Sequence, residues 1–238
     1  MPTRNLLYAK SLPINDDISL NIPTIGEVLE QEDNYFGIVS TITSTPYDMM
    51  VQLDDIGVDF STIDDYQLFL LTFNGLKTSD TSLIFGDFDF SGFELMQNVQ
   101  NGTLVMHDQN RNVTIDEGIF RLICDGIRKI HHLKRVNKKP GNLEAKKYMI
   151  QRARKKQARR KKRMEDSSLE STIVALVNTE QFSYTYETVR DMSIYQFYES
   201  LHQIIWKVDY DNKMHGVYAG TVSTKGMSQD EFNWLVHK

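Results

Sequence analysis

Residues 151–163, QRARKKQARRKKR, carry nine Lys or Arg side chains in thirteen positions. A helix through this segment has charge on every face and no apolar stripe, so we expect it to cross solvent or to lie against an anionic surface. The segment therefore divides the chain into three parts. We predict an acidic N-terminal lobe over residues 1–136, a basic helical arm over 137–168 and an aromatic helical lobe over 169–238.

The charge distribution has the same division. Residues 1–127 hold 5 Lys and Arg against 20 Asp and Glu, residues 128–163 hold 17 against 1, and residues 164–238 hold 5 against 11, within a net charge of -5. The chain is thus an acidic body interrupted by one strongly positive segment. At 238 residues with 40% hydrophobic side chains, it is long enough to bury one substantial core or two small ones.

Local patterns predict mostly helix. Thr24 and Glu27 have the spacing of a capping box, in which side chains bind the free amides of a first helical turn, and apolar residues at helical spacing come after them. Three further helix starts are expected, at Thr45 before Pro46, at Thr62 with Asp65, and at Thr114 with Glu117.

The rest of the chain adds a hairpin and longer helices. FELMQN and TLVMHD flank an Asn-Gly pair, which is the strongest short pattern for a β-hairpin. Asn142 can begin a helix that meets no proline or glycine until beyond Asn178, and that helix would be about 55 Å long if it were continuous. Ser193 precedes an amphipathic helix, and Ser228 with Glu231 predicts a terminal one. The expected fold class is α+β and predominantly α-helical, a bundle of short helices with a small β-hairpin and one long basic helix.

We find no convincing catalytic or metal-binding motif. DFDFSGFE begins like a calcium loop, but Asn98 occupies the twelfth position, where a bidentate glutamate is needed. His131 and His132 are adjacent and would diverge by about 100° on a helix, so we expect them at a helix end on the surface and not around a metal. Cys124 lies among apolar residues and is expected to be a buried structural thiol. We expect no enzymatic activity, no cofactor and no metal site.

Cysteine content and hydropathy indicate the cellular compartment in which the protein is expected. A single cysteine excludes an intrachain disulfide, which fits a reducing compartment. Nowhere do about 18 apolar residues run together, so no membrane span is expected. The cytoplasm is the expected compartment.

Two surfaces are candidates for binding a partner. The first is an aromatic helical face, although this face could equally close the core. The second is the basic arm, whose anionic partner could be the acidic body, a neighbouring subunit or a nucleic acid, with docking or plain solvation favoured over nucleic acid because Tyr148 is the one aromatic residue nearby. The candidate partner-binding residues are Ile194, Phe197, Tyr198, Leu201, Ile205, Trp206 and Trp234. The candidate residues of the basic arm are Arg152, Arg154, Lys155, Lys156, Arg159, Arg160, Lys161, Lys162 and Arg163.

Two blocks resemble a known class of phage protein. They are NIPTIGEVLEQEDNYFGIVSTITSTPYDMMVQLDDIGVDF and MSIYQFYESLHQIIWKVDYDNKMHGVYAGTVSTKGMSQDEFNWL, and together they cover about a third of the chain. They are similar to proteins encoded among the tail morphogenesis genes of tailed bacteriophages of Gram-positive hosts, in particular to tail assembly chaperones.

The resemblance implies a mostly helical, non-enzymatic protein of the host-cell cytoplasm. Such a protein binds the long helical tape-measure protein, keeps it soluble while the tail tube polymerises, and leaves before the tail is complete. Two alternatives stay open: a permanent virion or baseplate component, and a nucleic-acid-binding protein that uses the basic helix. No membrane partner is expected, and oligomerisation is left open.

Overall fold

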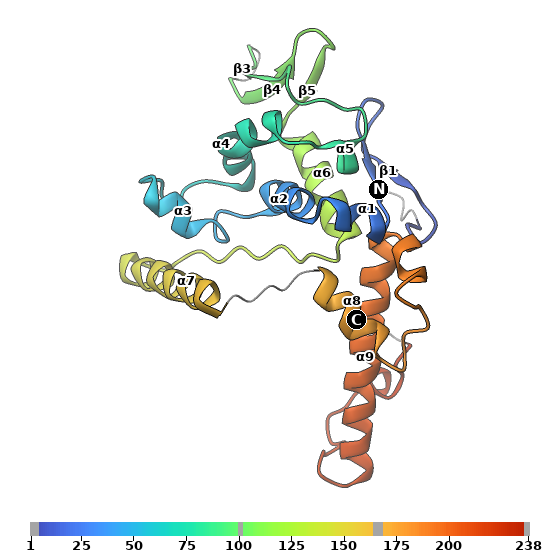
Figure 1. Cartoon of the computed structure of the whole chain (residues 1–238). Coiled ribbons are helices and arrows are strands. Elements are labelled where there is room, and N and C mark those ends of the chain that lie inside the picture. Colours follow the sequence, from blue (N-terminus) through green and yellow to red (C-terminus); the bar gives the residue numbers. More distant parts are fainter. Residues whose placement is uncertain (1–4, 100–101, 164–168, 236–238) are drawn as a thin grey trace.

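The computed structural model describes residues 5–99, 102–163 and 169–235, without the side chains of residues 160–163. Over these residues the protein is α+β and mainly helical, with two small antiparallel sheets (Figure 1). No described helix combines the length and the apolar character needed to cross a membrane. In chain order the elements are β1 (Ser11–Pro13), β2 (Ser19–Asn21), α1 (Ile25–Glu30), α2 (Glu32–Thr43), α3 (Met50–Asp55), α4 (Asp65–Thr78), α5 (Ser82–Phe85), β3 (Glu94–Gln97), β4 (Leu104–Asp108), β5 (Val113–Ile115), α6 (Glu117–Ile130), α7 (Leu143–Arg163), α8 (Leu169–Val177), η1 (Thr188–Asp191), α9 (Ile194–Tyr218) and η2 (Gln229–Phe232).

The first sheet pairs β1 with β2 and places Leu12 opposite Leu20, both buried. The second sheet has the order β3-β4-β5, which confirms the predicted hairpin as its first two strands. The third strand, β5, was not predicted. Thr114, which was expected to cap a helix, instead lies in β5 opposite His107. Asp116 caps α6, because its side chain accepts a hydrogen bond of 2.8 Å from the backbone amide of Ile119.

Of the other helix starts predicted before residue 80, one is confirmed and two are shifted by a few residues for local reasons. The box of Thr24 and Glu27 begins α1 as predicted. The predicted cap at Thr62 is wrong, because its hydroxyl donates to the carbonyl of Asp59 at 2.9 Å, and Asp64 caps α4 instead. The helix expected from Pro46 begins at Met50, since Asp48 accepts the amide of Thr45 at 2.9 Å and holds these residues in a turn.

One large core joins most of the elements. It contains buried residues of α1, α2, α4, α6 and α8, and the first turn of α9. Leu169 and Phe197, which belong to the predicted C-terminal lobe, therefore share their core with the N-terminal helices. The aromatic residues at its centre stack edge to face or tilted against one another, and they are Phe69, Phe73, Phe90, Phe93 and Phe120.

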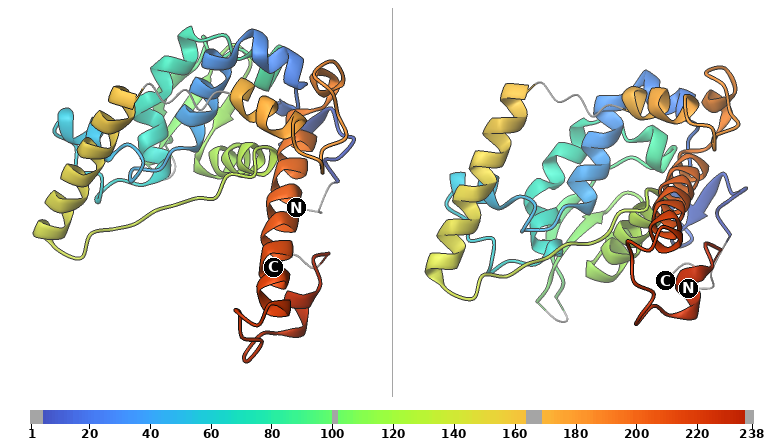
Figure 2. Two further views of the ribbon diagram at one scale, coloured as in Figure 1. Left: turned by 60° about the horizontal axis from the view of Figure 1, so that its bottom comes forward. Right: turned by 90° about the horizontal axis from the view of Figure 1, so that it is seen from below.

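A second, smaller core lies between α3 and α7. Ile150 of α7 is 7% exposed and packs with Leu53 and Phe60, among others. The basic helix is therefore anchored along one face, and Figures 1 and 2 place it at the edge of the molecule beside α3. The predicted continuity of this helix to Asn178 involves residues 164–168, which lie outside the described residues; the chain is helical on both sides of them.

The most prominent feature of the shape is α9. Its first turns are embedded in the body, and the rest projects away from it, with the chain that follows, up to residue 235, folded back along it (Figures 1 and 2). The two predicted binding surfaces, on α7 and α9, thus lie on different protruding parts of the molecule.

Candidate functional site

The root of α9 is fixed to α1. The two chain segments run antiparallel where the helices begin: the amide of Ile25 donates to the carbonyl of Met192 at 2.8 Å, and the amide of Ile194 donates to the carbonyl of Pro23 at 2.8 Å. Ser193 caps α9 as predicted, in a box with Gln196. The projecting helix therefore leaves the body in a direction that backbone hydrogen bonds determine.

The loss of this cap gives a testable prediction. Ser193→Ala removes the hydroxyl that accepts the amide of Gln196, and it should lower the free energy of unfolding by about 1 kcal/mol. Ser228→Ala is the matched control, because it makes the same change at the N-cap position of the exposed single turn η2. Urea denaturation followed by circular dichroism measures both. An equal effect of the two variants would contradict a special role for the cap of α9.

The first half of the predicted aromatic face closes the core. Ile194 and Phe197 are both 0% exposed, so they do not contribute to any surface. Tyr198 and Leu201 are half-buried and pack against the same core. Burial raises the pKa of Tyr198 to about 12, so its hydroxyl stays protonated at physiological pH.

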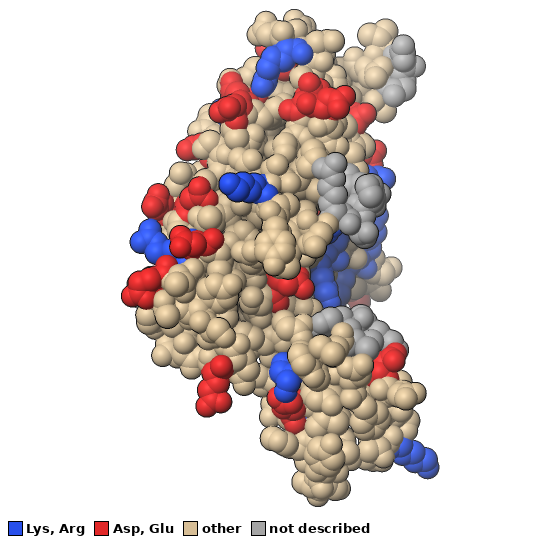
Figure 3. Space-filling view, turned by 90° about the vertical axis from the view of Figure 1, so that its right-hand side faces the viewer, with Lys and Arg blue, Asp and Glu red and all other residues tan. Residues whose placement is uncertain are grey.

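The second half of that face is open to solvent. Ile205 is 51% exposed and Val208 is 37% exposed. Together with Leu201 they succeed one another at steps of four and three residues, which places them on one side of the helix. Figure 3 shows that the projecting part carries few charged side chains on the side drawn. The result is a continuous apolar stripe that starts at the body and runs outward; we call Leu201, Ile205 and Val208 the α9 stripe.

The opposite side of the projecting helix is covered by the end of the chain. The indole NH of Trp206 donates to the carbonyl of Trp234 at 3.0 Å, and the hydroxyl of Tyr210 donates to the carbonyl of Phe232 at 3.1 Å. Lys213 forms an ion pair with Glu231. The two tryptophans predicted to bind a partner thus belong to this internal contact, on a different side from the α9 stripe.

The predicted terminal helix is only the single turn η2. Its capping box is present, since the carboxylate of Glu231 accepts the amide of Ser228 at 3.1 Å. Beyond it, however, the backbone of Asn233 is extended and its side chain accepts the amide of Leu235 at 3.1 Å. This local hydrogen bond competes with a helical one and ends the turn.

A histidine lies in the core beside α9, contrary to the prediction of two surface histidines. His131 is 5% exposed; its Nδ1 lies 2.9 Å from the carbonyl of Ile127 and its Nε2 lies 2.8 Å from the hydroxyl of Tyr35. A carbonyl accepts only, so Nδ1 donates and Nε2 accepts from the tyrosine. Burial lowers the pKa of His131 to about 4. His132 is half-buried, and its Nε2 lies 2.9 Å from the carboxylate of Glu199 on α9.

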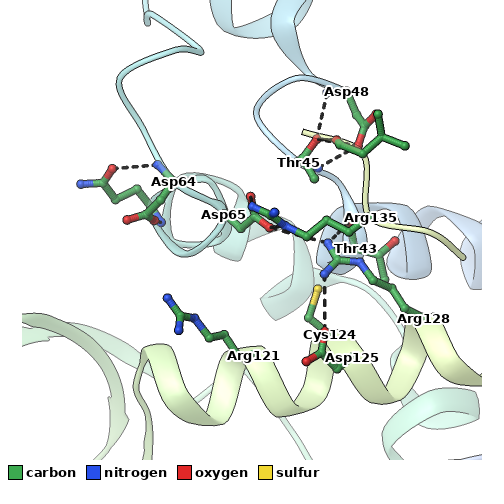
Figure 4. Close-up of polar contacts among 12 residues, drawn as sticks. Thr43, Thr45, Asp48, Asp64, Asp65, Arg121, Cys124, Asp125, Arg128 and Arg135 are labelled. Atoms are coloured by element: carbon green, nitrogen blue, oxygen red, sulfur yellow. Dashed lines mark hydrogen bonds and ion pairs between the residues drawn. The ribbon is translucent and has the colours of Figure 1, made fainter. Parts of the chain in front are cut away.

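A charged cavity of about 330 Å³ lies between α4 and α6 (Figure 4). Arg128 donates to the carbonyl of Thr43 at 2.7 Å and lies 3.7 Å from Asp65. Arg135 forms two hydrogen bonds with the same carboxylate, at 2.7 and 3.2 Å. These contacts tie the segment after α6 to α4, and we assign them a structural role because the cationic and anionic side chains are paired with one another.

Cys124 lies beside this network, and its predicted burial is confirmed. It is 2% exposed, and its Sγ donates to the carbonyl of Ile42 at 3.3 Å. Burial raises the pKa of the thiol to about 11. The thiol is therefore protonated and unreactive in the folded protein. Among the described residues, no group of His, Cys, Asp and Glu is arranged to hold a metal ion.

The basic arm is divided between two faces of α7. On the inner face, Lys146 lies 2.6 Å from Asp59, and Arg154 lies 2.8 Å from Asp54 and 2.5 Å from Asp55. The hydrogen bond from Lys146 is the main reason that the pKa of Asp59 falls to about 2. On the outer face, Arg152, Lys155, Lys156 and Arg159 are exposed. The helix continues through Arg160, Lys161, Lys162 and Arg163, whose side chains the structure does not describe.

Of the residues that anchor α7, the sequence analysis named Arg154 as a candidate for an anionic partner, but it did not identify Lys146 or Ile150. Lys146, Ile150 and Arg154 are spaced four apart and so share one face of the helix. An apolar residue at the centre of such a row, flanked by cations, is the pattern that could have indicated the docking face from the sequence alone.

One comparison with known proteins gives a match. Residues 157–237 match the family model of the YomV second domain, a phage-derived family of Bacillus prophage origin. The matched region is about a third of the chain and contains α8, η1, α9 and η2. This similarity is consistent with a phage origin. Comparison with curated proteins and with solved structures finds no match to the chain.

Proposed function

We propose that the protein assists phage tail assembly by binding another protein, and that it acts as a chaperone for the tape-measure protein. The observation that carries the proposal is the α9 stripe, an apolar surface with Ile205 and Val208 exposed, on a helix that projects from the body (Figure 1). The match of residues 157–237 to a phage-derived family covers this helix, and a phage origin supports a role in phage assembly.

The geometry of the stripe suits a helical partner. Apolar side chains at steps of three and four form the seam along which an amphipathic helix packs. A tape-measure protein is a long helical protein, and its apolar faces are without a partner until the tail tube surrounds them. A temporary apolar contact would keep such faces from aggregating. The fixed root of α9 presents the stripe to a partner without an ordering cost for the helix itself.

The test is co-expression with the tape-measure protein of the same phage. The variant Ile205→Asp/Val208→Asp places two charges in the stripe and should return the soluble fraction of the tape-measure protein to the level seen without this chain. The matched control is Ile56→Asp/Leu71→Asp, which introduces the same charges at apolar side chains that are 67% and 54% exposed on other elements. The control should leave the soluble fraction unchanged.

Two results would contradict the proposal. One is a tape-measure protein that is equally soluble without this chain, and the other is an equal loss with the stripe variant and with the control. Mass spectrometry of purified phage particles separates a chaperone, which is absent from them, from a permanent virion component, which is present.

A further inference from the structure

The outer face of α7 is a row of cations. Each residue of an α-helix turns by about 100°, so Arg152, Lys155, Lys156 and Arg159 fall within an arc of about 100°, while Ile150 lies on the opposite side. All four are exposed, and Arg152 and Arg159 are about 10 Å apart along the helix axis. We call these four residues the α7 outer row.

Three acidic side chains next to α7 pair with cations of its inner face. Asp54 and Asp55 pair with Arg154, and Asp59 pairs with Lys146, all on the inner face. Within the described part of the chain, none of the four outer-row side chains has an ion-pair partner. Docking on the body therefore accounts for the inner face of the basic helix and leaves the charge of the outer row uncompensated.

We propose that the α7 outer row binds the phosphate backbone of double-stranded DNA. A phosphate backbone is a dense row of negative charges, and cations without an apolar centre are sufficient to bind it. A protein partner would fit less well, because the buried centres of protein interfaces are depleted of charged residues and rich in aromatic and apolar ones. This surface is separate from the α9 stripe, and the inference does not depend on the proposed chaperone function.

The acidic body does not prevent this contact. At physiological salt the Debye length is about 8 Å, whereas a helix with its side chains is about 10 Å across. The acids behind α7 are therefore largely screened from a duplex that lies along the outer row. Ile150 packs against α3 on the opposite side of the helix, and Figures 1 and 2 place α7 at the edge of the molecule, so the outer row faces away from α3.

The experiment measures the affinity of the full chain for a short DNA duplex by fluorescence anisotropy over a series of NaCl concentrations. Each neutralised phosphate contributes about -0.9 to the slope of log K against log salt, so four contacts contribute about -3.6. The variant Arg152→Gln/Lys155→Gln/Lys156→Gln/Arg159→Gln should flatten the slope by about that amount. The matched control, Lys10→Gln/Arg121→Gln/Arg190→Gln/Lys225→Gln, removes the same net charge elsewhere and should keep the slope.

Three results would overturn the proposal. They are no binding of the duplex at low salt, an equal loss of slope in both variants, and salt-sensitive self-association in sedimentation without DNA binding. The last result would assign the outer row to the acidic body of a second copy of the chain. Circular dichroism of each variant checks that it is folded before its affinity is measured.

Discussion

Phe197→Ala is expected to lower the free energy of unfolding by about 3 to 5 kcal/mol. The ring is 0% exposed where α9 enters the core, and it packs edge to face on Tyr198 with centroids 5.8 Å apart. Alanine would remove the apolar contacts of the ring and leave a cavity that the fixed start of α9 cannot close. Urea denaturation at neutral pH measures the change.

The control for this variant is Phe232→Ala. Phe232 is an aromatic residue of the same type, but it is 43% exposed on the segment that contacts Tyr210 of α9. Its loss should change the stability by about 0.5 kcal/mol or less. If Phe197→Ala cost no more than this control, then the root of α9 would not be part of the cooperative core, and α9 would be free to detach from the body.

Acidification is expected to destabilise the protein through His131. The group has a folded pKa of about 4, below its ordinary value of 6.5, because it is buried. Between these two values the unfolded chain binds a proton that the folded protein does not, so the free energy of unfolding falls as the pH falls. The contribution of His131 to the free energy of unfolding is fully present above about pH 6.5. Its loss on acidification reaches about 3 kcal/mol near pH 4.

Neighbouring groups contribute to the same pH range, so the test compares variants. Burial also lowers the pKa of His132, and Glu199 opposes that shift. His131→Gln keeps a side chain that can accept from Tyr35, and it should show a shallower fall in stability between pH 6.5 and 4 than the unmodified protein. His215→Gln, at an exposed position of α9, should leave the pH dependence unchanged. Parallel curves for both variants and the unmodified protein would contradict the assignment to His131.

Sequence patterns predicted the fold class because it depends on local features. The caps at Thr24 and Ser193 were placed correctly, since a capping box lies within four residues of the chain. The caps expected at Thr62 and Thr114 were wrong, because in each case an aspartate two residues later competes for the same role. The strand β5 was missed, as three residues give too short an alternation to be separated from a helix cap.

The candidate surfaces were predicted only in part. Helical spacing identified the face of α9, but periodicity does not indicate where a helix leaves the body, so Phe197 and Ile205 could not be distinguished from the sequence. The composition of the basic arm likewise identified its charge without its two faces. The contact between Ile150 and α3 joins segments about a hundred residues apart, and such pairings leave no local pattern.

The burial of the one thiol has a practical consequence. Because the Sγ of Cys124 is enclosed beside α2 and its pKa is raised to about 11, an alkylating reagent can label it only after the core has opened. The rate of labelling then reports directly on opening of the native core, with no engineered probe and with no second site to confuse the signal. The same enclosure prevents this residue from cross-linking two copies of the chain when the surroundings become oxidising.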